Sequence, residues 1–245
     1  MRKKILYISA AVLSILIIIF LLAGVRLASM KEDKGKAEAK YVSDQEKKAF
    51  ISVDALCQHP ELPTGCESVA AVMVLGFYGD NVSAVEFAEN WLSKNSSFYT
   101  YEGQKFGPDP NYSFAGDPFT SYGYGCYAPA IADAVNANSE NCSALAVKGK
   151  SLEYLCAEYI DKGTPLLVWA TIDMTRSESG PGWVLPDGSF FTWISGEHCL
   201  VLVGYDDTYY YFNDPNKGDT VGYEKAIVNM RYREMGSQAV VITPK

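Results

Sequence analysis

The chain has little histidine, no cluster of basic residues in its body and too few cysteines for a fold built on disulfides. Among its 245 residues only His59 and His198 are histidines, so chemistry that needs an imidazole has two candidates. Acidic residues outnumber basic ones by 29 to 21, and the net charge of −8 argues against nucleic-acid binding. Six cysteines in a chain of this length do not form a disulfide scaffold.

Two common ligand-binding motifs are also missing. No C-x-x-C pair occurs, so the sequence offers no ordinary zinc site, and we predict neither a metal nor a cofactor. No G-x-x-x-x-G-K-[ST] motif occurs, which excludes a P-loop nucleotide site. The composition, 48% apolar and 20% charged, is instead typical of a globular chain with a sizeable core.

The N-terminal segment predicts a membrane anchor. Basic residues in 1–4 precede an uncharged apolar run over 5–25, which as a helix would span about 30 Å, the thickness of a bilayer core. A cleaved signal peptide, the alternative, has a shorter apolar region and a small-x-small cleavage site. The positive tip places residues 1–4 in the cytoplasm and everything after Arg26 outside the cell. Residues 26–49 read as a charged linker, and 50–245 as one domain.

The first half of the domain predicts helices. Thr64-Gly-Cys-Glu67 has the form of a capping box before an apolar helix face, and Ser83-Ala-Val-Glu86 repeats it. Further helices are expected at 127–137 and 151–162. Residues 95–126, rich in Asn, Ser, Gly, Pro and Tyr, predict a long irregular loop of the kind that is often functional.

The second half predicts strands. Runs of branched and aromatic residues indicate strands at 165–174, 190–194, 199–205, 209–213 and 238–243. Helices followed by strands indicate an α+β fold, with N-terminal helices packed on a C-terminal antiparallel sheet.

Cys66 is the first candidate for chemistry. It is expected in the first turn of a helix, where the unsatisfied N–H groups and the positive end of the dipole lower a thiol pKa. The alternative reading is a small buried residue, the commonest environment of a cysteine.

His198 and Asp214 complete a catalytic order. His198 begins a strand well downstream of Cys66, the order of a papain-type nucleophile and base. A hairpin that turns at Asp206 or Asp207 would bring Asp214 opposite His198, where it could hold the imidazole. Asp206 and Asp207 are weaker rivals at the hairpin tip. The alternatives are a core histidine and a turn-forming aspartate.

Three blocks of the chain resemble cysteine peptidase family thirty-nine, in its exported C39-like branch. They are Glu61-Leu-Pro-Thr-Gly-Cys-Glu67, then Gly196-Glu-His-Cys-Leu-Val-Leu-Val-Gly-Tyr-Asp206, then Asn213-Asp-Pro215. This papain-fold group includes the bacteriocin-processing, double-glycine peptidases. The resemblance implies a papain-like fold with Cys66 as nucleophile, His198 as base and then acid, and Asp214 as the orienting residue. The transporter domain of the bacteriocin processors is missing, so cleavage after a double glycine is not expected.

The resemblance also implies a donor for the negative charge that develops on the attacked carbonyl oxygen. Gln58, upstream of Cys66, is the glutamine that fits this role, together with the backbone N–H of Cys66. An exposed loop glutamine is the alternative. His59, its neighbour, is expected on an exposed loop.

The sequence as a whole predicts a membrane-anchored extracellular thiol hydrolase that cleaves peptide bonds through an acyl-enzyme. Its expected partners are a peptide or protein substrate and, through the N-terminal helix, the membrane. Two alternatives stay open: acyl transfer or cell-wall peptide hydrolysis by the same triad, and a non-enzymatic module that binds a peptide or wall fragment in a papain-like cleft.

Overall fold

The structure, a computed structural model, describes residues 40–41 and 48–245. The predicted cytoplasmic tip and the predicted anchor at 5–25 lie outside the described residues. In the part that is described, no helix is both long enough and apolar enough to cross a membrane.

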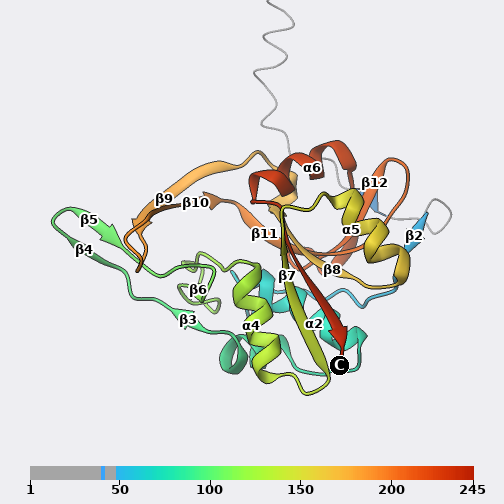
Figure 1. The fold of residues 1–245 in the computed structure, drawn as a ribbon, viewed down its shortest axis with the longest axis horizontal. Coiled ribbons are helices and arrows are strands. Elements are labelled where there is room, and N and C mark those ends of the chain that lie inside the picture. The colour runs from blue at the N-terminus through green and yellow to red at the C-terminus, as the bar shows by residue number, and fades with distance from the viewer. Residues whose placement is uncertain (1–39, 42–47) are drawn as a thin grey trace, which may run out of the picture. The chain divides into compact units, whose positions relative to one another are not determined.

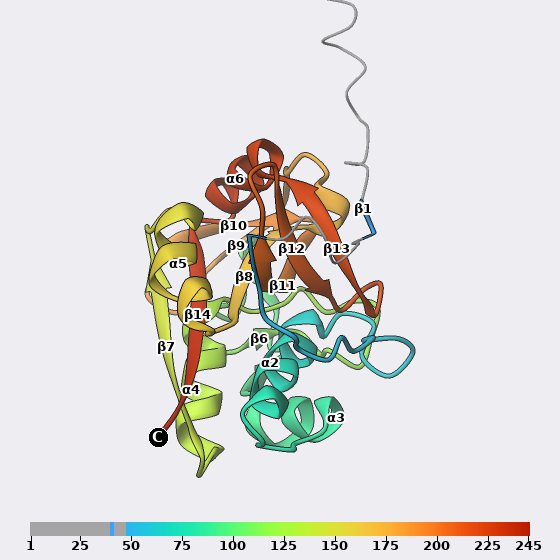
Figure 2. The same cartoon turned by 90° about the vertical axis from the view of Figure 1, so that its right-hand side faces the viewer.

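An 8-stranded sheet forms the centre of the domain (Figures 1 and 2), with strand order β1-β13-β12-β11-β8-β14-β7 and β2 paired to β11. All of its pairings are antiparallel. Its strands are β1 (Lys40–Tyr41), β2 (Ala49–Phe50), β7 (Cys142–Lys148), β8 (Leu166–Thr171), β11 (Glu197–Tyr205), β12 (Tyr209–Asp214), β13 (Asp219–Glu224) and β14 (Gln238–Pro244). Since β1 and β2 belong to this sheet, the fold begins before residue 50, inside the segment expected to be a linker.

The central strands β8 and β11 are covered by other elements. Every residue of β8 is buried, and so is every residue of β11 except Tyr205. A strand covered on both sides reads as a continuous apolar run, which is how both segments appear in the sequence. The predicted sheet and its antiparallel pairing are therefore confirmed, although β7 and β13 were not expected.

Helices pack around this sheet. Helix α2 contacts β11 and β8, α4 contacts β7 and β14, and α6 contacts β8, β12 and β13. The helices are α2 (Cys66–Phe77), α3 (Ala84–Glu86) with the π-helical turn Phe87–Trp91, α4 (Ala128–Asn138), α5 (Leu152–Glu158) and α6 (Lys225–Glu234). Because α6 follows strand β13, the helices are not confined to the N-terminal half as predicted.

The expected loop at 95–126 is wrong in part, because it contains four short strands. The strands β3 (Lys94–Asn95) and β6 (Phe114–Ala115) pair in parallel. The strands β4 (Tyr99–Tyr101) and β5 (Gln104–Phe106) join β9 (Glu178–Val184) and β10 (Phe190–Ser195) in a second sheet, with order β10-β9-β5-β4. Figure 1 shows this second sheet projecting from the main one as an arm.

The arm is held together by aromatic side chains. Phe98, Tyr124 and Phe191 each lie within about 5 Å of the ring of Trp183, at centroid distances of 5.3, 5.1 and 5.0 Å. Aromatic residues favour strands, so the Tyr-rich composition of 95–126 is consistent with the strands observed there. The interspersed Gly and Asn interrupt the alternation of apolar and polar residues by which a strand is recognised in a sequence.

The predicted capping box at the start of α2 is wrong. The helix begins after Gly65, and no side chain caps it. The hydroxyl of Thr64 donates to the carbonyl of Thr120 at 2.9 Å, so it serves the neighbouring loop. The second predicted cap is confirmed, because Ser83 Oγ accepts the backbone N–H of Glu86.

Candidate active site

Cys66 is the first residue of α2, the helix that packs on β11. Its side chain is 5% exposed. The Sγ atom accepts the backbone N–H of Cys199 at 3.4 Å and donates to Glu67 Oε2, also at 3.4 Å. Helix α2 therefore delivers the thiol to strand β11 at the residue next to His198.

His198 and Asp214 form a buried pair. His198 Nε2 lies 2.7 Å from Asp214 Oδ1, and the two residues are 2% and 1% exposed. The β11–β12 hairpin brings them together, with Val201 opposite Asn213, so the predicted juxtaposition is confirmed. Because a carboxylate oxygen accepts, Nε2 carries the proton, and Nδ1 is left as the proton acceptor of the ring.

Asp214 is held in its ionised form. Burial alone would raise its pKa, but the hydrogen bond and charge of His198, the backbone N–H of Asn216 and the charge of Lys217 together lower the pKa below its ordinary value. The rival Asp206 stays at the turn, where it accepts the backbone N–H groups of Thr208 and Tyr209 at 2.6 Å.

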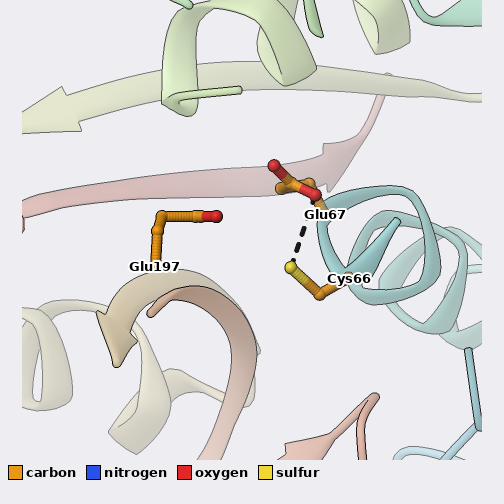
Figure 3. Close-up of side chains that lie close together, drawn as sticks. All are labelled: Cys66, Glu67 and Glu197. Carbon is orange, nitrogen blue, oxygen red and sulfur yellow. Dashed lines mark hydrogen bonds between the residues drawn. The ribbon is translucent and has the colours of Figure 1, made fainter. Parts of the chain in front are cut away.

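Cys66 and His198 share the site without a direct hydrogen bond between them. Within residues 48–245, Sγ is bonded to the Cys199 N–H and to Glu67, and not to the imidazole. Figure 3 shows the thiol turned toward Glu67. The structure thus places the thiol at the backbone of Cys199, the residue after the expected base, and directs it at the carboxylate of Glu67.

Gln58 belongs to the site region, and the alternative of an exposed loop glutamine is wrong. Its side chain is 5% exposed, and its backbone N–H donates to the carbonyl of Pro215, next to Asp214. The side-chain Nε2 donates to the carbonyl of Pro63 at 3.0 Å, while Oε1 is buried without a partner. His59 is exposed, as predicted, and is bonded to Asn216 Oδ1 at 2.9 Å.

Two glutamates next to the expected catalytic residues form a second buried group. Glu67 Oε1 accepts the backbone N–H of Cys126 at 2.6 Å, and Glu197 Oε1 is buried without a hydrogen-bond partner. Burial raises the pKa of Glu67 to about 7. Burial also raises the pKa of Glu197, and the nearby charge of Glu67 raises it further.

The two glutamates and the burial of the site change the pKa of the Cys66 thiol. Burial raises the pKa of Cys66 well above its ordinary value, and the charges of Glu67 and Glu197 raise it further. The hydrogen bond from Cys199 lowers this pKa and is outweighed. The sequence-based expectation of a lowered pKa is therefore wrong, because burial and the like charges of the two glutamates disfavour the thiolate.

Neither glutamate is among the site residues that the sequence predicts. The sequence pattern places Glu67 in a capping box and indicates no role for Glu197. A signal existed, since two of the expected catalytic residues have a glutamate beside them: Glu67 follows Cys66, and Glu197 precedes His198. A charged residue inside a run that is otherwise buried is uncommon unless it is paired or functional.

Comparison with known proteins places the chain in a family. The sequence profile of the Peptidase_C39 like family matches residues 50–240, and the chain belongs to this family. It is 34% identical over 222 residues to the uncharacterized protein YvpB of Bacillus subtilis (strain 168), a match that covers 87% of this chain and 79% of YvpB. The fold is similar to the crystal structure of a candidate C39-like peptidase from Bacillus anthracis, with a TM-score of 0.69 and 26% identity. This match covers 81% of this chain and 98% of that one.

Proposed function

We propose that this protein is a cysteine peptidase in which Cys66 is the nucleophile, His198 the general base and Asp214 the residue that orients the imidazole. The observation that carries the proposal is the buried 2.7 Å hydrogen bond between His198 Nε2 and Asp214 Oδ1. It leaves Nδ1 as the basic nitrogen of a ring on the same strand as the Cys199 N–H that binds Sγ. The family supports the class of reaction, since its members are C39-like peptidases.

The first step is proton transfer from the thiol to the imidazole. The Cys66 side chain turns about its Cα–Cβ bond from Glu67 toward Nδ1 of His198, which takes the thiol proton. Asp214, kept ionised by its lowered pKa, stabilises the imidazolium that forms. Sγ then attacks the peptide carbonyl, and the imidazolium donates its proton to the departing amine. Water activated by His198 hydrolyses the acyl-enzyme.

The oxyanion of the first step needs hydrogen-bond donors. As the first residue of α2, Cys66 has a backbone N–H with no acceptor inside the helix, and this group is the proposed first donor to the oxyanion. Gln58 is the proposed second donor. Its backbone is tied to Pro215, and its Nε2 would exchange the Pro63 carbonyl for the oxyanion.

The aromatic arm is the proposed wall for the substrate. Gly125 lies between the carboxylate of Glu67 and the ring of Trp193, which stacks on Tyr127 at 5.6 Å. From there the arm reaches exposed rings at Tyr99, Tyr101 and Phe190. Aromatic faces of this kind suit an extended peptide, because they bind apolar side chains and stack on flat amide groups.

The location of the enzyme remains the one that the sequence predicts. We propose that 5–25 anchor the chain and that the peptidase domain lies outside the cell. Protease added to intact cells should digest residues 48–245 and leave a membrane-bound N-terminal fragment. A domain protected until the cells are lysed would contradict this location.

A proteome-derived peptide library tests the activity. Wild-type protein should generate new peptide termini that mass spectrometry detects, and Cys66→Ala should generate none. The control is Cys57→Ala, which removes the exposed thiol and should cleave like wild type. A library left intact by wild type, or cleaved equally by Cys66→Ala, would refute the proposed function.

A further inference from the structure

The side chains of Cys66, Glu67 and Glu197 converge in a way that the peptidase mechanism does not use. One ligand atom from each, a thiol sulfur and two carboxylate oxygens, lie within 4.8 Å of one another, and all three residues are buried. Figure 3 shows Glu197 extending from β11 toward the thiol and the Glu67 carboxylate on α2. Two buried carboxylates this close repel each other unless a proton or a cation lies between them.

Glu197 supplies an independent indication of a ligand. Its side chain is more than nine-tenths buried, is directed at the other two residues, and has Oε1 without a hydrogen-bond partner. A buried carboxylate oxygen without a partner carries a desolvation cost of several kcal/mol in general, which a bound ligand would offset.

We propose that Cys66, Glu67 and Glu197 form a binding site for a divalent transition-metal ion such as Zn²⁺. A sulfur ligand excludes Mg²⁺ and Ca²⁺, which prefer oxygen, and favours zinc and its relatives. The ion displaces the thiol proton and the carboxyl protons to water, leaving a thiolate and two carboxylates as ligands. The fourth position of a tetrahedral ion is open to water.

The distances suit a tetrahedral ion. With a metal–sulfur bond near 2.3 Å and a metal–oxygen bond near 2.0 Å, adjacent sulfur and oxygen ligands lie about 3.5 Å apart. Cys66 Sγ and Glu67 Oε2 are 3.4 Å apart. The Glu197 carboxylate has to approach by at most about 1.5 Å to complete the set, given the 4.8 Å limit on all three atoms.

The ligands are oriented by groups behind them. Glu67 Oε1 is fixed by the Cys126 N–H, and the Cys126 carbonyl in turn accepts the indole N–H of Trp169 at 2.9 Å. The sulfur accepts the backbone N–H of Cys199, which stabilises a thiolate. Outer contacts of this kind hold a ligand in place and typically change metal affinity by 10–100-fold.

The consequence for the peptidase rests on the proposed function. A metal ion on Sγ occupies the electron pair that attacks the substrate and keeps the thiol on the Glu67 side, away from His198. Zn²⁺ would therefore be a reversible inhibitor that binds the nucleophile, and release of the ion would free the enzyme.

Cobalt titration of the untagged chain tests the site without any activity assay. Co²⁺ added to wild type should produce a thiolate-to-cobalt charge-transfer band that saturates at one ion per chain and that Zn²⁺ abolishes. Cys66→Ala should lose the band, and Glu197→Gln should weaken Co²⁺ binding by at least about tenfold. The matched controls, Cys57→Ala and Glu61→Gln, remove an exposed thiol and an exposed carboxylate and should bind like wild type.

His198→Ala separates this proposal from the proposed function, because it should keep the cobalt band while losing peptide cleavage. Circular dichroism of every variant confirms folding, and Cys66→Ser, which keeps the size of the side chain, replaces Cys66→Ala if that variant unfolds. The absence of a band in wild type, a band that persists without Cys66, or wild-type affinity in Glu197→Gln would each overturn the metal site. Cleavage of peptides with no band would leave the peptidase standing alone, and a band with no cleavage would leave the metal site alone.

Discussion

The two buried polar groups beside β11 solve the same problem in opposite ways. His198 and Asp214, here called the paired group, form a hydrogen bond with each other, and the pKa of Asp214 is lowered. Glu67 and Glu197, here called the crowded group, both lie close to the protonated thiol of Cys66. Glu197 Oε1 has no hydrogen-bond partner, and burial raises the pKa of both glutamates. Burial is similar in the two groups, so what separates them is whether each charge has a partner of opposite sign.

Removing the imidazole should have the largest effect. His198→Ala takes away the base that the paired group holds ready and should lower kcat/KM for a cleaved peptide by about 10²–10⁴-fold. The measurement is initial-rate kinetics on one peptide that the library identifies. A loss of less than threefold would mean that the paired group is structural.

The same change of carboxylate to amide should act in opposite directions on the two groups. Asp214→Asn loses a charge-assisted hydrogen bond and should destabilise the fold at pH 8 by about 1–3 kcal/mol. Glu67→Gln keeps an oxygen for the Cys126 N–H, removes a buried charge, and should raise stability by about 1 kcal/mol. Urea unfolding of both variants beside wild type makes the comparison, and equal destabilisation would contradict it.

A new methyl group at Gly125 should disturb the carboxylates of Glu67 and Glu197 and, less closely, the ring of Trp193. A Cβ there would lie 2.7 Å from Glu67 Oε1 and 2.8 Å from Glu197 Oε2, so Gly125→Ala should cost about 1–3 kcal/mol. Gly188→Ala is the control, since Gly188 also has a positive φ but has open space around its Cα. Thermal melts that show equal losses for the two variants would mean that backbone strain, not the carboxylates, sets the cost.

Stability should also depend on pH through the crowded group. The pKa of Glu67 is raised from an ordinary 4.5 to about 7. Its contribution to the free energy of unfolding is therefore full below pH 4.5 and is lost as the pH rises through about 7. Asp214 acts in the opposite sense, with stability lost only as the pH falls below its ordinary value of 3.8. Urea unfolding from pH 4.5 to 8 should show a decline that Glu67→Gln makes shallower, and an unchanged slope would exclude Glu67 as its source.

The smallest expected effect is on the reactivity of the thiol. The charge of Glu67 raises the pKa of Cys66, so Glu67→Gln should speed its alkylation by iodoacetamide at pH 8 by about three- to tenfold. Glu61→Gln, an exposed carboxylate, should leave the rate unchanged. Peptide mapping gives the rate for Cys66 alone, and a slower rate in Glu67→Gln would reverse the assigned effect.

The paired group could be predicted from the sequence because a hairpin is local. A turn at Asp206 and strands of known period are enough to bring Asp214 to His198 without knowledge of the rest of the fold. The assignment of Cys66 as the nucleophile then follows from its position upstream of His198, which is the papain-type order. The same locality made the strand predicted at 209–213 correct within one residue and the strand predicted at 199–205 correct within two.

The convergence of the crowded group could not be predicted because the residues in contact are far apart in the sequence. Glu67 accepts a hydrogen bond from the backbone N–H of Cys126, 59 residues further along the chain. The strands in the segment 95–126 that leads to Cys126 are not evident in the sequence because of its Gly and Asn content. The raised pKa of Cys66 depends on that packing and not on its place in α2. Helix α6 was missed for another reason: its buried face consists of only Val228 and Tyr232, spaced i and i+4 among polar residues.

The most direct test of the central claim is the mass of the protein during its first turnovers. A reaction of wild type with a cleaved peptide, quenched in acid within the first turnovers, should show an increment equal to the acyl half of that peptide. We predict that this increment is a thioester on Cys66, released by hydroxylamine and absent from Cys66→Ala. Cleavage that proceeds with the increment on another residue, or that persists in Cys66→Ala, would contradict it.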